Sequence, residues 1–382
     1  MKRAVSLLEQ YDGKEPFSIY YKKAIALDKK VGSTDRKIIR HYCYALFRIG
    51  FACADVPLEE RLLIAVYLVH GDTDPLIKLV RPEWVAKGAA SFEQRLALVC
   101  PDFSWQRVFP LPITFSMALT LEEWAKSLLS QPAFFIRIRP GKQQQVINKL
   151  EEASIPFKIV SSSALALPTA TNLDAILALN KDYVVQDLSS QRVGEFLQPL
   201  LPETIQSVWD CCAASGGKSL LLMDQYPSLE LTVSDVRPSI LQQLKTRFKQ
   251  AGINNYHALV LDLSQQGLPK KATQFDLVIA DVPCSGSGTW ARTPEQITRQ
   301  TKEILDEFTK RQRAILSRLP AALKPGGYLL YCTCSVFASE NEEQVAWIQR
   351  EFGLTLCQQS LLKGMAEQAD TLYVALLQKT SS

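Results

Sequence analysis

The chain has 382 residues, of which 47% are hydrophobic and 21% charged, and its mean hydropathy is -0.02. This composition is typical of a globular protein and excludes a disordered, collagen-like or coiled-coil chain. The length suffices for two or three domains, each with its own core. The first residues do not resemble a secretory signal peptide, and no apolar run approaches the roughly 18 residues that span a bilayer. We therefore expect a cytoplasmic protein.

Charge and cysteine are both unevenly distributed along the chain. Residues 1–50 carry 11 Lys or Arg and 5 Asp or Glu, whereas the whole chain has 43 and 39. A basic segment ahead of a near-neutral body favours a nucleic-acid or acidic-membrane partner, although a solvated helix face would give the same pattern. Of the nine cysteines, five lie between residues 211 and 334. In a reducing compartment they are core packing, metal ligands or catalytic groups.

The first 128 residues are predicted to be helical. Apolar side chains recur at helical spacing over 17–27 and 38–49, and a further apolar helix is expected at 62–69. Residues 33–35, with the sequence Ser-Thr-Asp, are N-cap candidates for the second of these helices.

The pattern changes twice further along the chain. Residues 129–184 are predicted as a small α+β module, with strands at 133–139 and 157–160 and a helix at 145–153. From residue 185 strands and helices alternate, which predicts a parallel, doubly wound α/β sheet of the Rossmann-like kind. The expected strands are 207–210, 229–234, 257–261, 275–280, 328–332 and 372–378, and the expected helices are 220–226, 240–251, 295–319 and 341–350.

Polar residues and glycines follow the predicted strands of this sheet, where open α/β sheets bind their ligands. The first strand leads into Gly216 and Gly217 ahead of a helix, where the backbone can approach a ligand closely. The next three strands end at Asp235, Asp262 and Asp281. Carboxylates suit ribose hydroxyls and repel phosphate, so this pattern favours a nucleoside cofactor, although Asp262 could instead cap a turn.

Two cysteine motifs follow the fourth and fifth strands. Residues 281–288 read DVPCSGSG, and residues 331–335 read YCTCS. Together with CAASGGK at 212–218, they resemble the NOL/NOP/Sun (Fmu/Sun) family of RNA cytosine-5 methyltransferases. The corresponding family segments are D-A/V-P-C-S-G-x-G, YSTCS and CAAPGGK. This chain departs from them with Ser215 in place of proline and Cys332 in place of serine.

The resemblance is strongest over residues 183–345, where it includes QDLSSQ at 186–191 and ENE at 340–342. It extends more weakly to residues 134–139, in the place of the family's small RNA-binding module. Residues 31–48 resemble the helical NusB-like domain of the bacterial ribosomal-RNA members. Residues 370–373 read DTLY where the family often has DGFF. The resemblance implies a helical NusB-like RNA-binding domain over 1–128, a small α+β RNA-binding module over 129–184 and an S-adenosylmethionine-dependent methyltransferase domain over 185–382.

The resemblance also implies a reaction and a set of site residues. The expected reaction transfers a methyl group from S-adenosylmethionine to C5 of a cytosine in RNA. Cytosine C5 is a poor nucleophile until a thiolate adds to C6. By resemblance, Cys334 is this nucleophile, Cys284 assists product release, and Asp281 holds the cytosine edge or the sulfonium end of the cofactor. Lys218 is expected to lower the pKa of a nearby thiol. The expected cofactor-binding residues are Cys212, Ala213, Ala214, Ser215, Gly216, Gly217, Lys218, Asp235, Asp262 and Asp281.

The remaining cysteines are expected to be packing rather than a metal site. Their spacing does not give two C-x2-C pairs, and the chain has only three histidines. Packing is expected for Cys43, Cys53, Cys100, Cys211, Cys332 and Cys357.

Alternatives and partners complete the sequence-based expectations. A non-catalytic RNA-binding ribosome assembly factor could keep the fold, and a DNA cytosine methyltransferase would use Cys284 as its nucleophile. A nicotinamide-dependent dehydrogenase would need G-x-G-x-x-G after the first strand, which is absent. We expect a monomer that binds RNA, with ribosomal RNA favoured over transfer RNA, and no metal or membrane. Contacts to the RNA backbone are expected from Lys22, Lys23, Lys29, Lys30, Arg36, Lys37, Arg40, Arg48, Arg137, Arg139, Arg311 and Arg313.

Overall fold

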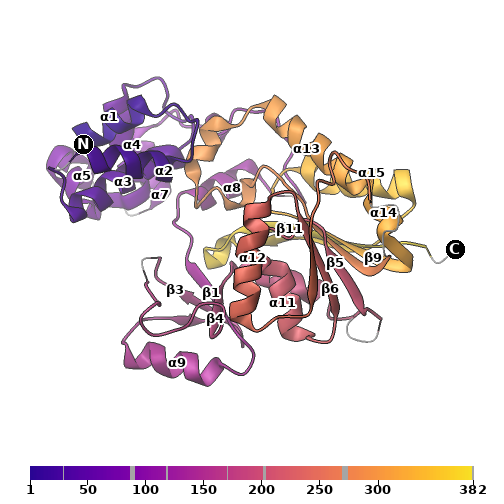
Figure 1. Ribbon diagram of the computed structural model, residues 1–382. Coiled ribbons are helices and arrows are strands. Elements are labelled where there is room, and N and C mark those ends of the chain that lie inside the picture. The colour runs from indigo at the N-terminus through magenta and orange to yellow at the C-terminus, as the bar shows by residue number, and fades with distance from the viewer. Residues whose placement is uncertain are drawn as a thin grey trace. The chain divides into compact units, whose positions relative to one another are not determined.

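The computed structural model describes residues 1–28, 30–86, 91–117, 119–169, 171–200, 204–268 and 274–380. The chain forms two compact units (Figure 1). The helical unit comprises Met1–Ile113, Ala118–Gln131 and Thr289–Lys302, and the catalytic-fold unit comprises Thr114–Met117, Pro132–Gly288 and Glu303–Ser382. Residues 289–302 therefore pack with the helical unit, although the sequence pattern assigned them to the third domain.

The helical unit confirms the helices expected in the first third of the chain. Leu62 to Leu68 are all buried, so the helix that contains them is enclosed on every side. The N-cap expected at residues 33–35 is wrong, because these residues form the first helical turn and Gly32 is the cap. The elements are α1 (Lys2–Gln10), α2 (Phe17–Leu27), α3 (Ser33–Arg48), α4 (Leu58–His70), η1 (Gly71–Thr73), α5 (Pro75–Val80), α6 (Pro82–Ala86), α7 (Phe92–Val99), η2 (Trp105–Arg107), α8 (Leu121–Leu128) and η5 (Pro294–Arg299).

A buried aromatic cluster explains why residues 289–302 belong to this unit. The Trp290 ring lies 5.7 Å from the ring of Phe109 and 5.6 Å from that of Trp124, between centroids. The buried carboxylate of Glu295 accepts a hydrogen bond from the backbone N–H of Phe17. The helix expected over 295–319 is wrong at its start for the same reason, since its first residues form the short turn η5 instead.

The small sheet of the catalytic-fold unit has four antiparallel strands in the order β2-β3-β1-β4. The apolar side chains of its helix pack against the sheet, for example Val146 and Leu150 against Ile136 and Tyr183. Two of the four strands were not expected, because runs of three or four residues carry little periodicity. The elements are β1 (Phe134–Ile138), α9 (Gln143–Glu152), β2 (Lys158–Ile159), β3 (Ala164–Leu167) and β4 (Tyr183–Val185).

The large sheet has seven strands in the order β10-β11-β9-β8-β5-β6-β7. The strands from β9 to β7 in this order run parallel, as expected. The last two strands of the chain, β10 and β11, depart from this pattern and pair antiparallel; the sequence predicted β11 but not β10. Only residues 364–370 join them, too few for the crossover that parallel strands need. The strands are β5 (Ser207–Asp210), β6 (Glu230–Asp235), β7 (Tyr256–Val260), β8 (Phe275–Asp281), β9 (Leu323–Thr333), β10 (Thr355–Lys363) and β11 (Thr371–Gln378).

Two helices cover one face of the large sheet and fix the loop that follows β5. Figure 1 shows α11 and α12 beside β5 and β6, and Leu220 and Leu244 from these helices join Val208 and Val233 in one core. No helix within the described ranges is long and apolar enough to cross a membrane. The helical elements are α10 (Leu188–Arg192), η3 (Val193–Phe196), α11 (Gly217–Gln225), α12 (Pro238–Ala251), η4 (Ser287–Thr289), α13 (Lys302–Leu316), α14 (Leu319–Ala322), η6 (Ala338–Glu340), α15 (Glu342–Phe352) and η7 (Met365–Glu367).

Candidate active site

A cavity of about 400 Å³ opens beyond the carboxyl ends of the parallel strands. Its lining residues come from the segments after β5, β6, β7, β8 and β9 and from α13. This is the position at which open α/β sheets bind ligands. The structure brings seven of the expected site residues to this cavity: Cys212, Ala214, Asp235, Asp262, Asp281, Cys284 and Cys334.

The other expected residues of the loop after β5 do not line the cavity. Gly216 has φ +80°, and a Cβ there would lie 2.7 Å from the Phe248 ring, so glycine allows α12 to pack closely against the loop. Ala213 is buried, and its N–H donates to Ser234 O at 2.8 Å. These residues shape the loop, and Cys212 and Ala214 are the expected loop residues that line the cavity.

The carboxylate at the end of β6 is firmly held. Asp235 Oδ2 accepts a hydrogen bond from Ala214 N–H at 3.0 Å, and Oδ1 accepts from Arg237 N–H and Nε–H, both at 2.9 Å. Burial on its own would raise the pKa of Asp235, but the hydrogen bonds from Arg237 and Ala214 bring that pKa below its usual value. The group therefore stays ionised and faces the cavity as an acceptor.

Apolar surface lies beside these acids. Val236, directly after the β6 carboxylate, is 51% exposed, and it lines the cavity together with Leu263. Asp262 lines the same region, and its Oδ1 also accepts from Ser264 N–H and Oγ–H at 2.9 and 2.6 Å. Asp262 thus caps a turn and also faces the cavity, so a role as a turn cap is compatible with a role as a cofactor contact.

The two motif cysteines meet at the cavity wall. The distance from Cys284 Sγ to Cys334 Sγ is 3.3 Å, and both are free thiols. Cys211 and Cys332 are buried, as expected for packing, but Cys357 is exposed on the edge strand β10, so the packing expectation is wrong for it.

An ion pair connects the loop after β5 to the end of β8. Lys218 Nζ lies 2.5 Å from Asp281 Oδ2. Burial lowers the pKa of Lys218, but the charge and hydrogen bond of Asp281, together with the nearby Cys332 and Asp210, outweigh burial and raise that pKa overall. The charge of Lys218 does act to lower the pKa of the Cys332 thiol, but burial of that thiol dominates and raises its pKa. The expected lowering of a thiol pKa therefore does not occur at Cys332.

A second acid close to this ion pair received no role from the sequence. Asp210, the last residue of β5, is 1% exposed, and its Oδ2 accepts from Ser219 Oγ–H at 2.6 Å. Its Oδ1 has no hydrogen-bond partner among the described residues. Burial, together with the charge of Asp281, raises the pKa of Asp210 to about 7.

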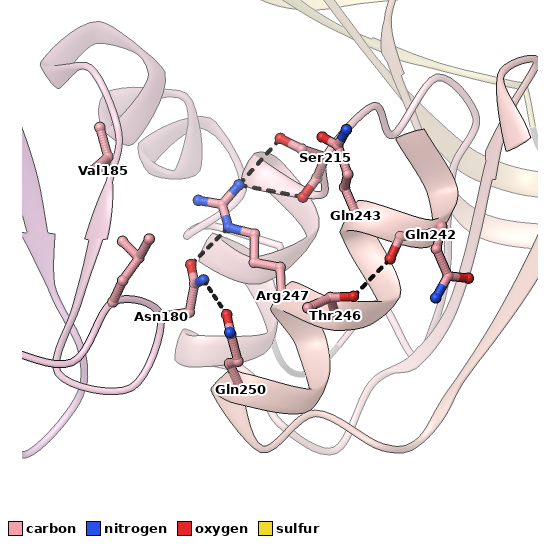
Figure 2. A pocket seen from close by; sticks show the side chains of 9 residues that line it. Asn180, Val185, Ser215, Gln242, Gln243, Thr246, Arg247 and Gln250 are labelled. Atoms are coloured by element: carbon pink, nitrogen blue, oxygen red, sulfur yellow. Dashed lines mark hydrogen bonds between the residues drawn. The ribbon is translucent and has the colours of Figure 1, made fainter. Parts of the chain in front are cut away.

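Ser215, the serine at the family's proline position, does not line this cavity, and Figure 2 shows it beside Arg247 of α12 in a second pocket. Arg247 Nη1 donates to both Ser215 O and Ser215 Oγ at 3.3 Å, and Arg247 Nε donates to Asn180 Oδ1 at 3.0 Å. Asn180 Nδ2 in turn donates to Gln250 Oε1 at 2.8 Å. A chain of hydrogen bonds through α12 thus joins the loop after β5 to the loop before β4.

Several basic residues expected at an RNA surface have structural roles instead. Arg48 is 4% exposed and donates to the carbonyls of Leu128 and Ser130. Arg137 and Arg139 both pair with the buried Asp224, at 2.5 and 2.8 Å. Lys29 lies outside the described residues. The exposed members of the expected basic surface in the helical unit are Lys22, Lys23, Lys30, Lys37 and Arg40.

The cavity lining also includes residues that were not expected as cofactor contacts, among them Val236, Arg237 and Arg311. For the first two a signal existed, because they directly follow an acid at a strand end. Arg311 was expected only as an RNA contact, and its place on α13 at the cavity depends on the tertiary fold.

The parallel sheet and the cavity beyond it define a Rossmann-like methyltransferase fold. The crystal structure of PH0851 has this fold, with a TM-score of 0.69, 21% identity and coverage of 98% of this chain and 97% of that one. The structure of NSun6 from Pyrococcus horikoshii with SFG has a TM-score of 0.60 at 15% identity and covers 69% of this chain and 94% of its own.

Sequence comparisons find relatives named as ribosomal RNA methyltransferases. The family model described as 16S rRNA methyltransferase RsmB/F matches residues 197–375. Ribosomal RNA small subunit methyltransferase B of Xylella fastidiosa is 30% identical over 66% of this chain, and a probable protein of the same name from Synechocystis is 31% identical over 56%. The chain spans 60% and 49% of the length of these two relatives. These matches support the resemblance to the NOL/NOP/Sun (Fmu/Sun) methyltransferase family that the cysteine motifs carry.

Proposed function

We propose that this protein transfers a methyl group from S-adenosylmethionine to C5 of a cytosine in RNA, and that ribosomal RNA is the substrate. The observation that carries the proposal is the pair of free thiols 3.3 Å apart on the wall of a cavity that also holds Asp235. The names of the relatives support ribosomal RNA. Because the mechanism needs two reduced thiols, the proposal also requires a reducing compartment such as the cytoplasm.

The donors and surfaces of the cavity fit S-adenosylmethionine. The ionised Asp235 is suited to accept from the two ribose hydroxyls, and Val236 and Leu263 offer apolar surface to the adenine. By resemblance, we assign Asp262, which lines the same cavity, to the adenine, whose amino group can donate to a carboxylate. Acidic residues favour a cofactor with a cationic sulfur over one with phosphates. When bound, this cofactor supplies an electrophilic methyl group.

We assign Cys334 as the nucleophile. Its thiolate adds to cytosine C6, and the electron pair of the C5–C6 double bond then makes C5 nucleophilic. Cys284 is less suited to this role. The hydrogen bond with Cys334, then burial, and then the nearby charges raise the pKa of Cys284, so this thiol keeps its proton.

Asp281 and Cys284 assist the reaction in this proposal. Lys218 pairs with Asp281 Oδ2, which leaves Oδ1 to hold the amino edge of the cytosine. After methyl transfer, a base such as a water molecule takes the C5 proton, the C5–H electron pair restores the C5–C6 double bond, and the Cys334 sulfur leaves C6 as a thiolate. The Cys284 thiol, 3.3 Å from the departing sulfur, donates a hydrogen bond to the thiolate that forms. The target base must be unstacked, because stacking covers its C5–C6 edge.

Replacement of each cysteine tests this assignment. Cys334→Ala should abolish methylation, because no other thiol can form the C6 adduct. Cys284→Ala should form the adduct but release it slowly, so a covalent protein–RNA species should persist on a denaturing gel. Cys357→Ala, which alters an exposed thiol on β10, is the control and should behave as the wild type.

Two outcomes would count against the proposal. If Cys334→Ala traps the adduct and Cys284→Ala forms none, the two roles are reversed. If calorimetry at high micromolar concentration detects no binding of S-adenosylmethionine, the non-catalytic assembly factor becomes the better reading.

A further inference from the structure

A buried carboxylate joins the two loops that carry the cysteines. Glu340, in the turn η6, is fully buried. Its Oε2 accepts from Ser285 Oγ–H and from Ser335 Oγ–H, both at 2.5 Å, and its Oε1 accepts from Ser285 N–H at 2.8 Å. Ser285 directly follows Cys284 and Ser335 directly follows Cys334. One side chain thus contacts the nearest neighbour of each thiol.

Two further contacts fix the carboxylate in place. Gln312 Nε2, from α13, donates to Glu340 Oε1 and to Pro283 O, both at 3.0 Å. Tyr331 Oη–H donates to the backbone carbonyl of Glu340 at 2.5 Å. The two carboxylate oxygens therefore accept four hydrogen bonds from protein donors. An ionised carboxylate can accept all of them, whereas a protonated acid would have to donate one.

The charge of this group acts on one thiol of the pair. Burial raises the pKa of Glu340, and the hydrogen bonds from Ser285, Ser335 and Gln312 oppose that rise. Glu340 is in turn one of the charges that raise the pKa of the Cys284 thiol, after the contact with Cys334 and burial. A negative charge fixed beneath this loop disfavours a second negative charge on its sulfur.

We propose that Glu340 is a positioning residue that clamps the two cysteine loops together and holds the Cys284 S–H as a hydrogen-bond donor to the Cys334 sulfur. The role of Glu340 in the reaction rests on the proposed function, whereas its contacts with both cysteine loops do not depend on that function. Without the clamp, the sulfurs would lose their fixed 3.3 Å separation and Cys284 would lose its proton more readily.

Glu340→Gln is the most informative replacement. It keeps the size and one acceptor oxygen, and the new amide can donate to Ser285 Oγ and Ser335 Oγ, because hydroxyl groups accept as well as donate. The fold should therefore persist while the charge is lost. Glu295→Gln is the matched control, since Glu295 is also fully buried but belongs to the helical unit. Glu340→Ala removes the charge and the hydrogen bonds together.

The kinetic test uses the full chain with S-adenosylmethionine and unmodified 16S ribosomal RNA made by transcription. Glu340→Gln should lower kcat about tenfold, because misplaced reacting groups are costly, while both KM values stay within about twofold. The alkaline limb of the pH–rate profile should move to lower pH, since Cys284 then loses its proton earlier. Glu295→Gln should change neither. A lower melting temperature with unchanged kcat and pH profile would overturn the proposal, because it would leave Glu340 a purely structural role.

A second readout does not depend on activity. In chains that carry Cys334→Ser, the rate of Cys284 alkylation by iodoacetamide is followed against pH by mass spectrometry. Adding Glu340→Gln should shift this profile to lower pH, and an unchanged profile would contradict the effect of Glu340 on Cys284. If the profile shifts but the wild type methylates no cytosine, the proposed function fails and the clamp stands.

Discussion

At the scale of single residues, the position of a charged side chain in the fold decides whether it reaches the cavity or pairs with a buried partner. The acids at the ends of β6, β7 and β8 reach the cavity, because the carboxyl ends of parallel strands share one edge of a sheet. The sequence could therefore predict Asp235, Asp262 and Asp281. It could not predict that Arg137 would be buried against Asp224, because the partner lies 87 residues further along the chain. A basic residue in a strand pattern does not show whether it meets solvent or a buried acid.

The buried Asp210 gives a prediction for stability against pH. Its pKa of about 7 lies above the ordinary aspartate value of 3.8, so the folded state holds a proton that the unfolded chain has lost. Folding stability therefore falls as the pH rises from about 4 to 7, by at most about 4 kcal/mol. Asp210→Asn removes this pH-dependent loss of stability. The difference in melting temperature, variant minus wild type, should therefore increase from pH 5 to pH 8.

A control of opposite sign is available for that prediction. Ser207 and Lys324 donate to Asp276, and although its partial burial acts to raise the pKa of this carboxyl, these hydrogen bonds lower it overall. Asp276→Asn should therefore lower the folding stability at pH 8, and this loss of stability should become smaller as the pH falls below 4. If Asp210→Asn showed the same trend as this control, Asp210 would not carry a raised pKa.

At the scale of elements, the sequence pattern predicted the strands of the parallel part of the large sheet but missed the edge strand β10 and the short strands β3 and β4. The central strands β8 and β9 are mostly buried and were expected, whereas β10 is a largely exposed edge strand without an apolar pattern and was not. The loop after β5 was recognised from its motif. Its link to α12 was not, because the partners of Ser215 lie on a helix that the motif does not include.

The contact between α12 and this loop predicts an effect on cofactor binding. Arg247→Ala removes two hydrogen bonds to Ser215, with a net loss of about 1 kcal/mol. If the loop holds the cofactor, the Kd for S-adenosylmethionine should rise about fivefold in calorimetry. Lys245→Ala, an exposed change on the same helix, is the control and should leave the Kd unaltered. An unchanged Kd for Arg247→Ala would show that this contact does not support the cofactor loop.

At the scale of the whole molecule, the chain is not divided at contiguous boundaries. Residues 289–302 belong to the helical unit through Trp290 and Glu295, which no reading of consecutive segments could anticipate. The boundaries proposed from the sequence, near residues 128 and 184, follow changes of pattern along the chain. Side chains that pack across long separations do not alter such patterns.

The basic surface of the helical unit gives a prediction for RNA binding. Lys30, Lys37 and Arg40 are exposed. If they contact phosphates, reversing the charge of Lys30 and Lys37 to Glu should weaken binding of 16S ribosomal RNA and flatten its salt dependence, by about one unit of slope for each lost contact. Lys363→Glu, on β10 of the other unit, is the matched exposed control. An unchanged slope in the double variant would remove these lysines from the RNA surface.

The central claim is that Cys334 forms a covalent bond to cytosine C6 during methyl transfer. The most direct measurement is mass spectrometry of the Cys284→Ala protein after reaction with unmodified 16S ribosomal RNA and S-adenosylmethionine, followed by nuclease and protease digestion. We predict one modified peptide, in which Cys334 carries a cytidine with an added methyl group. A cytidine on any other residue, or methylated RNA formed by a protein that also lacks the Cys334 thiol, would contradict the account.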